Sequence, residues 1–182
     1  MARIQPLPQS VASADLQSDW AQHVADYPGS RITNMKATLS HSRLAFQIYM
    51  QWYPLYEQVR QIVGDRLAYL YAHAISIGAD CPLCTTFFRE IIIQNGERPE
   101  SLALSERGQA LLNFGGTLAQ HKGTVSDELY ALIEQEYTPE QIVVLVAFAG
   151  QMIATNVFNN ALEVEIDEYL HPYLPTQSAS NV

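Results

Sequence analysis

Hydrophobic residues recur at helical spacing along most of this sequence. In "DRLAYLYAHAISIG", residues 65 to 78, apolar side chains follow one another at intervals of three and four residues, the repeat of a helix with a buried face. No stretch keeps the alternation of apolar and polar residues that is typical of a half-buried strand. The pattern therefore predicts an all-α fold, a compact helical domain of seven or eight helices.

Residues typical of helix ends place two of these helices next to each other. Asp65 is expected to cap the helix over 65–78, and Gly78 to end it. Asp80 is expected to cap the next helix, which has Pro82 in its first turn and closes at Asn95-Gly96. Only a short turn is left between the two helices.

The same signals predict the other helices. A short helix within the first 27 residues stops before Pro28, because the residue before a proline avoids the helical region. Residues 34–63 are expected to form two helices, with a cap at Ser40 to Ser42 and a break or kink at Pro54. Further helices begin at Ser105, Ser126 and Thr138, and the last one runs to Glu163.

No linker is long enough to separate two domains. We divide the chain into an arm with a short helix over 1–33, a helical domain over 34–170 and a tail over 171–182. The longest apolar stretch, residues 142–154, is too short to span a bilayer, so we expect a buried core helix and no membrane contact.

Composition and charge narrow the class of protein. Of the 182 residues, 48% are hydrophobic and 16% are charged, which is typical of a globular chain. The net charge of −9 and the scattered basic residues argue against nucleic acid as a partner. The N-terminus lacks the continuous apolar stretch of a secretory signal. With a close pair of cysteines, this indicates a cytoplasmic protein in a reducing compartment.

The pair Cys81 and Cys84, the only cysteines of the chain, is the main candidate for chemistry. Residues three apart share one helix face, and Cys81 lies at a helix N-terminus, where backbone N–H groups favour a thiolate. Asp80 opposes this effect with its own negative charge. Such a pair suits thiol–disulfide exchange or peroxide reduction, in which one cysteine becomes a sulfenic acid and the other resolves it. The alternatives are simple packing and a metal site, which would need ligands that the spacing of the histidines does not supply.

Several polar residues could assist the cysteines. His73 could act as a base for a thiol or an acid for a leaving group, and Tyr69, one turn earlier, could relay a proton; either could instead belong to the core. Arg89 is expected to be a solvated charge. The amides of Asn156, Asn159 and Asn160 are expected to bond to a neighbouring helix end, or else to line a pocket.

These residues resemble the alkylhydroperoxidase D and carboxymuconolactone decarboxylase family. The resemblance rests on "AHAISIGADCPLC", the following "TTFFREIIIQNGE" and an apolar helix ending in "TNVFNNAL", and it covers residues 34–165. It implies an antioxidant enzyme, a peroxidase or disulfide oxidoreductase, with Cys84 as the peroxidatic cysteine and Cys81 as its resolving partner. It also implies a small hydroperoxide or disulfide substrate, an electron-donor protein or thiol, a homo-oligomer, and no cofactor or metal.

The chain departs from the family pattern at the proton relay. The redox members carry a histidine where this chain has Phe88 and a glutamate where it has Tyr69. His73 could substitute for them. Two other functions stay open: a decarboxylase-like lyase or small-molecule-binding relative, and a helical oligomer that senses redox state without catalysis. The aromatic stretch "IYMQWYPLYEQV", residues 48–59, is either a subunit interface or part of the core.

Overall fold

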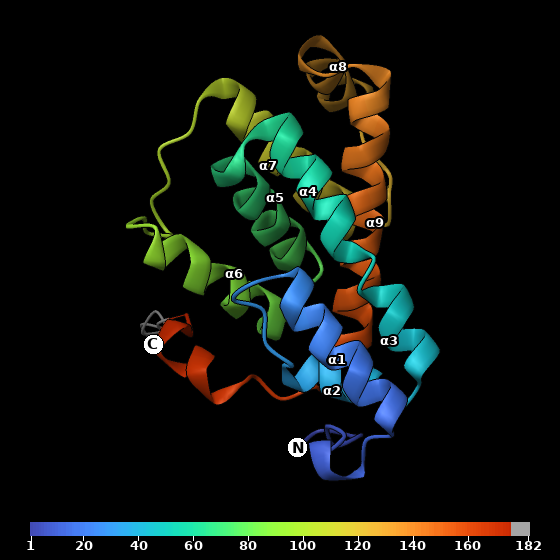
Figure 1. The fold of residues 1–182 in the computed structure, drawn as a ribbon. Helices are drawn as coiled ribbons and strands as arrows, with labels where there is room; N and C mark the ends of the chain where they lie inside the picture. The colour runs from blue at the N-terminus through green and yellow to red at the C-terminus, as the bar shows by residue number, and fades with distance from the viewer. Residues whose placement is uncertain (176–182) are drawn as a thin grey trace, which may run out of the picture.

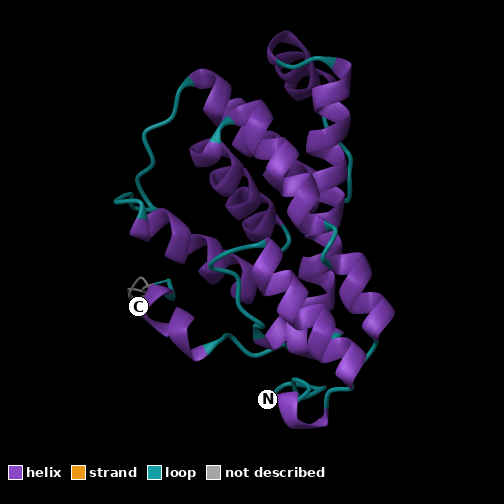
Figure 2. Ribbon diagram, viewed as in Figure 1, coloured by secondary structure: helices purple, strands orange, loops and turns teal. Residues whose placement is uncertain are grey.

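The computed structural model describes residues 1–175, which form nine α-helices, two short 3₁₀ helices and no strand (Figure 1, Figure 2). This confirms the predicted all-α fold. Residues 176–182, most of the predicted tail, lie outside the described residues. The helices are α1 (Ala14–Asp26), α2 (Asn34–Leu39), α3 (Arg43–Tyr49), α4 (Trp52–Val63), α5 (Asp65–Gly78), α6 (Pro82–Gln94), α7 (Glu106–Gln120), α8 (Asp127–Glu136) and α9 (Pro139–Leu162), with η1 (Gln9–Val11) and η2 (Glu168–Tyr173).

Several helices begin where local sequence predicts. The side chains of Ser105, Ser126 and Thr138 each accept a backbone hydrogen bond from the first turn of α7, α8 and α9. Residues 34–63 form three helices, one more than expected, because Ser42 caps α3 and Pro54 lies inside the first turn of α4 without breaking it. A proline fits there because its missing N–H would have no partner inside the helix.

Two predicted caps are wrong. Asp65 is the first residue of α5, and the preceding Gly64, with φ 82°, occupies the cap position. At the next helix Cys81 takes the cap position instead of Asp80, and its sulfur accepts the backbone N–H of Cys84. Asp80 has a left-handed φ of 49° and closes the turn between α5 and α6.

Helix α5 lies at the centre of the main core, between α7, α6, α4 and α9. Its residues Leu70, Tyr71 and Ile75 are fully buried, and Phe148 of α9 packs beside the ring of Tyr71. At its C-terminal end Gly78 lies directly against Gly116 of α7, where a Cβ would collide with the Gly116 carbonyl oxygen. The two helices can approach this closely only because the position lacks a side chain.

A second cluster joins α1, α2 and α3. Trp20, Leu39 and Phe46 are buried in it, and the indole N–H of Trp20 donates to the hydroxyl of Ser40 at 2.8 Å. Figure 1 shows α1 and α2 beside the lower part of α9, next to the end of α6 that carries the cysteines. The N-terminal residues therefore pack against the rest of the chain near the candidate site.

Helix α9 is a core helix in this structure. By length and composition alone it could cross a membrane, and it is the one helix within residues 1–175 of which this is true. Leu145, Phe148 and Ala149 are fully buried against the other helices. Its residue Phe148 also contacts the stacked rings of Trp52 and Tyr56, so these partly buried aromatics of the 48–59 stretch pack against the main core.

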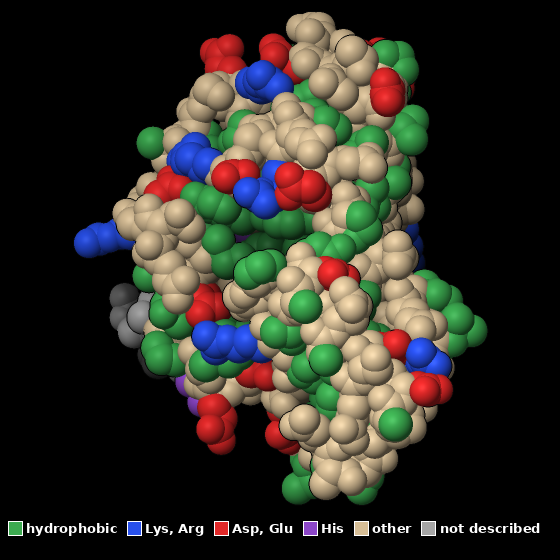
Figure 3. Space-filling view, viewed as in Figure 1, with side chains coloured by type: hydrophobic (Ala, Val, Ile, Leu, Met, Phe, Trp, Pro, Cys, Tyr) green, Lys and Arg blue, Asp and Glu red, His purple; other side chains and the backbone are tan. Residues whose placement is uncertain are grey.

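One face of the molecule is hollowed in its middle. Figure 3 shows hydrophobic side chains lining the hollow, with Lys, Arg, Asp and Glu side chains around it. Charges of both signs lie scattered over this face rather than forming one basic patch.

Candidate active site

The two thiols meet at the start of α6. The backbone N–H of Cys81 donates to the carbonyl oxygen of Ser76, which fixes the residue against the end of α5. The Cys81 sulfur then accepts the N–H of Cys84 at 3.4 Å. Both residues are buried, with 1% of Cys81 and 5% of Cys84 exposed, and no disulfide joins them. The predicted proximity of the two cysteines on one helix face is thus present.

The surroundings of the two thiols shift their pKa values in opposite directions. A hydrogen bond from the Cys84 thiol and backbone N–H groups of the first turn lower the pKa of Cys81, although burial opposes this. The hydrogen bond to Cys81 and burial raise the pKa of Cys84, and the side-chain amide of Asn159, donating to its sulfur at 3.2 Å, opposes the rise. When the pair loses a proton, the thiolate is therefore favoured at Cys81 over Cys84.

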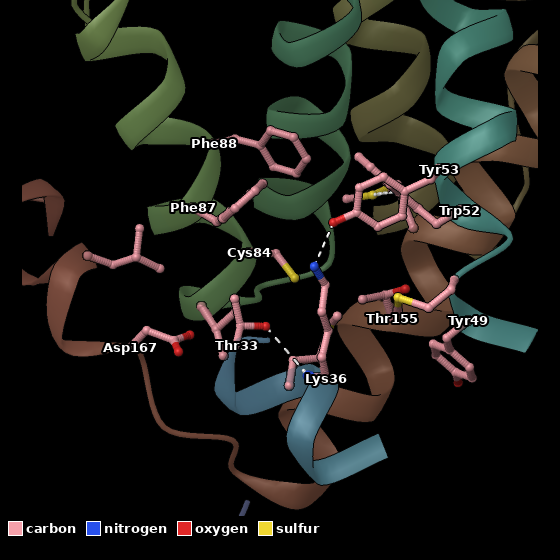
Figure 4. A pocket seen from close by; sticks show the side chains of 15 residues that line it. Thr33, Lys36, Tyr49, Trp52, Tyr53, Cys84, Phe87, Phe88, Thr155 and Asp167 are labelled. Carbon is pink, nitrogen blue, oxygen red and sulfur yellow. Dashed lines mark hydrogen bonds between the residues drawn. The ribbon is translucent and has the colours of Figure 1, made fainter. Parts of the chain in front are cut away.

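One of the two cysteines lines an apolar cavity. Cys84 lines a cavity of about 90 Å³ between α2, α4, α6 and α9 (Figure 4), and Cys81 is not among the residues that line it. The walls are mostly apolar and aromatic. The lining residues are Thr33, Met35, Lys36, Tyr49, Met50, Trp52, Tyr53, Leu83, Cys84, Phe87, Phe88, Met152, Thr155, Asp167 and Leu170. Such a site suits a small apolar molecule held by a few polar contacts.

Lys36 is the unexpected member of this lining. It is 4% exposed, and its ammonium donates to the Ser30 hydroxyl at 2.9 Å, the Arg31 carbonyl at 2.7 Å and the Tyr53 hydroxyl at 2.8 Å. Burial lowers the pKa of Lys36 to about 7, although the nearby Asp167 carboxylate raises it. Sequence reasoning missed Lys36 and Tyr53. A signal was present, because Lys36 is one of only two lysines and stands between the apolar residues Met35 and Ala37.

His73 and Tyr69 do not line the cavity. The Tyr69 hydroxyl donates to Glu97 at 2.9 Å, and burial raises the pKa of Tyr69 to about 12. His73 is buried, and its Nε2 has no hydrogen-bond partner among residues 1–175. Burial and the charge of Arg89 lower the pKa of His73 to about 4. The cavity lining thus contains Phe88 but neither His73 nor Tyr69, the two residues that were expected as a possible proton relay.

Arg89 is not the solvated charge that was expected. Only 10% of its side chain is exposed, because it binds Glu100 at 2.6 Å and donates to the Tyr173 carbonyl at 2.9 Å. The 3₁₀ helix η2 covers this part of α6, a long-range contact that the local sequence does not signal.

The three asparagines of α9 have different roles. Asn160 donates to the carbonyls of Ala79 and Asp80 at the end of α5, as expected for a helix-end contact. Asn159 donates to the sulfur of Cys84. Asn156 is fully buried, and neither its amide nitrogen nor its oxygen has a hydrogen-bond partner within the described part of the chain.

The site combines two thiols, a buried ammonium and a phenol near one cavity. This set can attack an electrophile, form a disulfide and transfer a proton. Among residues 1–175, no group of three or more His, Cys, Asp or Glu side chains is arranged to hold a metal ion.

Known structures share this fold. Neither protein-family models nor curated proteins give a match to the sequence. The debrominase Bmp8 superposes with a TM-score of 0.77 at 16% identity, over 93% of this chain and 95% of its own. A cysteine-to-alanine variant of Bmp8 in complex with 2,3,4-tribromopyrrole gives 0.78, again at 16% identity, over 93% and 94%. The fold is alkylhydroperoxidase D-like (AhpD-like).

A third structure agrees with this assignment of the AhpD-like fold. An uncharacterized peroxidase-related protein from Silicibacter sp. TM1040 superposes with a TM-score of 0.65 at 12% identity, over 88% of this chain and 89% of its own. At these identities the likeness concerns the fold.

Proposed function

We propose that this protein is a thiol-dependent oxidoreductase that reduces a small electrophilic substrate, a hydroperoxide in the first instance, with Cys84 and Cys81. The observation that carries the proposal is the position of Cys84, whose sulfur lines an apolar cavity while a second thiol is hydrogen-bonded behind it. A peroxidase-related protein and a debrominase among the structural neighbours are in keeping with a redox role.

The reaction balances with the two thiols as the source of electrons. Cys84 passes its proton to the Cys81 thiolate and attacks the terminal oxygen of R–O–OH as a thiolate. An S–O bond forms and the O–O bond breaks, so Cys84 becomes a sulfenic acid and the peroxide leaves as RO⁻, which takes up a proton. Cys81 then attacks the Cys84 sulfur; a disulfide forms, and the hydroxide leaves as water after protonation. A thiol or dithiol reductant restores the reduced pair.

The assignment of roles follows from access and charge. Cys84 lines the cavity and can therefore contact a substrate bound there, whereas Cys81 does not line the cavity. The favoured thiolate at Cys81 serves first as the base for Cys84 and later as the resolving nucleophile. Asn159 stabilises negative charge on the Cys84 sulfur through its amide hydrogen bond.

The test counts thiols after one equivalent of cumene hydroperoxide is added to the reduced protein. The wild-type chain should lose two thiols and release one equivalent of the alcohol. Cys81→Ser should stop at a sulfenic acid that dimedone traps, and Cys84→Ser should remain reduced. Repeated turnover with dithiothreitol would separate an enzyme from a sensor. A wild-type pair that stays reduced, or a Cys84→Ser variant that oxidises equally fast, would refute the proposal.

A second candidate is reductive removal of bromine from a small aromatic ring. Aromatic side chains line the cavity, and the Bmp8 variant bound to a tribromopyrrole has the same fold. Here Cys84 would take the bromine as an S–Br group while the ring carbon gains a proton, and Cys81 would displace bromide to form the disulfide. Release of one bromide per disulfide from a bromopyrrole, without oxidation by hydroperoxide, would favour this candidate.

A further inference from the structure

We propose that Tyr53 is the catalytic acid of this site and that Lys36 positions it, so that the N-terminal helices supply the proton relay absent from the α5–α6 side of the cavity. This inference rests on the proposed thiol chemistry at Cys84. It assigns a role to residues of α2 and α4 that the family pattern does not include.

The two groups face the reacting sulfur across the cavity. Tyr53, Lys36 and Cys84 all line it. In Figure 4 the hydroxyl of Tyr53 and the ammonium of Lys36 point toward the part of the cavity that contains the Cys84 sulfur, and the drawn hydrogen bond joins the first two. A molecule attacked by Cys84 would therefore lie beside the Tyr53 hydroxyl.

The hydrogen bonds made by the Lys36 ammonium indicate to which group the Tyr53 hydroxyl can donate its proton. An ammonium has three N–H donors, and those of Lys36 are directed to the oxygens of Ser30, Arg31 and Tyr53. The carbonyl of Arg31 can only accept. With Lys36 protonated, the Tyr53 oxygen accepts from Lys36, and a hydrogen bond from the Ser30 side chain also favours its charged form. The Tyr53 oxygen is thus the acceptor in both contacts, and its own O–H can donate to a bound molecule.

The network behind Tyr53 holds the pair in place. Ser30 also makes a 2.8 Å hydrogen bond with Nε2 of His23, and the His23 ring packs edge-on against the Tyr53 ring with centroids 4.7 Å apart. His23 comes from α1 and Ser30 from the loop that follows it. The residues before α2 thus fix both the ammonium and the phenol ring.

The proposed step is a transfer of one proton. As Cys84 attacks the terminal peroxide oxygen and the O–O bond breaks, the leaving RO⁻ takes the proton from the Tyr53 O–H and departs as an alcohol. The Tyr53 phenolate is held by the Lys36 ammonium, which returns a proton to it. No electrons pass through either residue; both electrons come from the Cys84 sulfur.

The nature of the leaving group provides the test. An alkoxide leaving from an alkyl hydroperoxide needs a proton, whereas a carboxylate leaving from a peracid does not. We expect Tyr53→Phe to slow Cys84 oxidation by tert-butyl hydroperoxide about 100-fold or more, the usual range for a lost general acid, and to change the peracetic acid rate by less than about threefold. Lys36→Met should shift the ratio of the two rates in the same direction.

Tyr56→Phe is the matched control. Tyr56 lies one turn further along α4 and does not line the cavity, so its ratio of rates should equal that of the wild type. If Tyr53→Phe keeps the wild-type ratio while the wild type reacts, the relay is refuted and the thiol chemistry stands. A parallel loss of both rates also contradicts an acid role. A wild-type chain that reacts with neither peroxide contradicts both proposals.

Discussion

At the scale of single residues, Asn159 links the long helix α9 to the reacting sulfur. It is 3% exposed, and its amide donates to the Cys84 sulfur at 3.2 Å. A hydrogen bond to a charged group contributes about 1.5–3 kcal/mol when buried, and it favours the thiolate over the thiol. The residue therefore helps to determine how readily Cys84 gives up its proton.

Replacing Asn159 with leucine should raise the thiol pKa of Cys84. Leucine has a similar size and no donor, so the Cys84 thiolate loses a hydrogen bond that favours it and its pKa should rise. The measurement is the rate of alkylation by iodoacetamide as a function of pH, with the modified residue identified by mass spectrometry. Asn160→Leu is the control, because Asn160 bonds to backbone carbonyls and not to sulfur. An unchanged profile for Asn159→Leu would contradict the role of the amide.

At the scale of helices, the contact of α5 with α7 holds the end of α5 in place, directly before the turn that leads to Cys81. Gly78 ends α5 against Gly116, and the turn to Cys81 follows at once. By contrast, Gly150 in the middle of α9 has open space around the position of a Cβ. The two glycines therefore have opposite predicted responses to the same substitution.

Gly78→Ala should destabilise the protein and Gly150→Ala should stabilise it. The added methyl at 78 meets a backbone carbonyl that cannot move aside, so we expect a loss of about 1–3 kcal/mol. At 150 alanine improves helix propensity, and we expect a gain of about 0.5–1 kcal/mol. Urea unfolding monitored by circular dichroism measures both values. Equal effects of the two substitutions would contradict the close approach of α5 and α7.

At the scale of the whole molecule, two buried histidines make the folded state sensitive to acid. His23 lies in the N-terminal cluster and His73 in the main core. Burial, with Lys36 facing His23 and Arg89 facing His73, lowers each pKa to about 4, although Asp26 and Glu100 act in the opposite direction. Both clusters of the fold should therefore lose stability in the same pH range.

The free energy of unfolding should fall as the pH decreases from 6.5 to 4. In this range the unfolded chain binds protons at its histidines while the folded chain does not, so protonation favours unfolding. Urea titrations at pH 7 and pH 4.5 should show a fall that is about 2 kcal/mol smaller in His73→Phe than in the wild type. Parallel curves for the two proteins would show that His73 is not held neutral.

The predictions that the structure confirms concern signals within one turn of a helix. Ser105, Ser126 and Thr138 are recognisable as caps because a cap bonds to residues two or three positions away. The predictions for Asp65 and Asp80 are wrong although aspartate is a good cap, because the backbone of Gly64 and the left-handed turn at Asp80 move each helix start by one residue. The prediction for Arg89 is wrong because η2 returns to cover it from a distant part of the chain.

The sequence by itself determined the all-α class, most helix starts and the proximity of Cys81 and Cys84, since helical periodicity and capping act over three or four residues. Only the tertiary structure decided which side chains share a cavity with Cys84. His73 and Tyr69 lie close by along the chain but outside the cavity lining, while Lys36 and Tyr53 join it from α2 and α4. The physical reason is that the packing of whole helices, and not spacing along one of them, decides which faces surround a cavity.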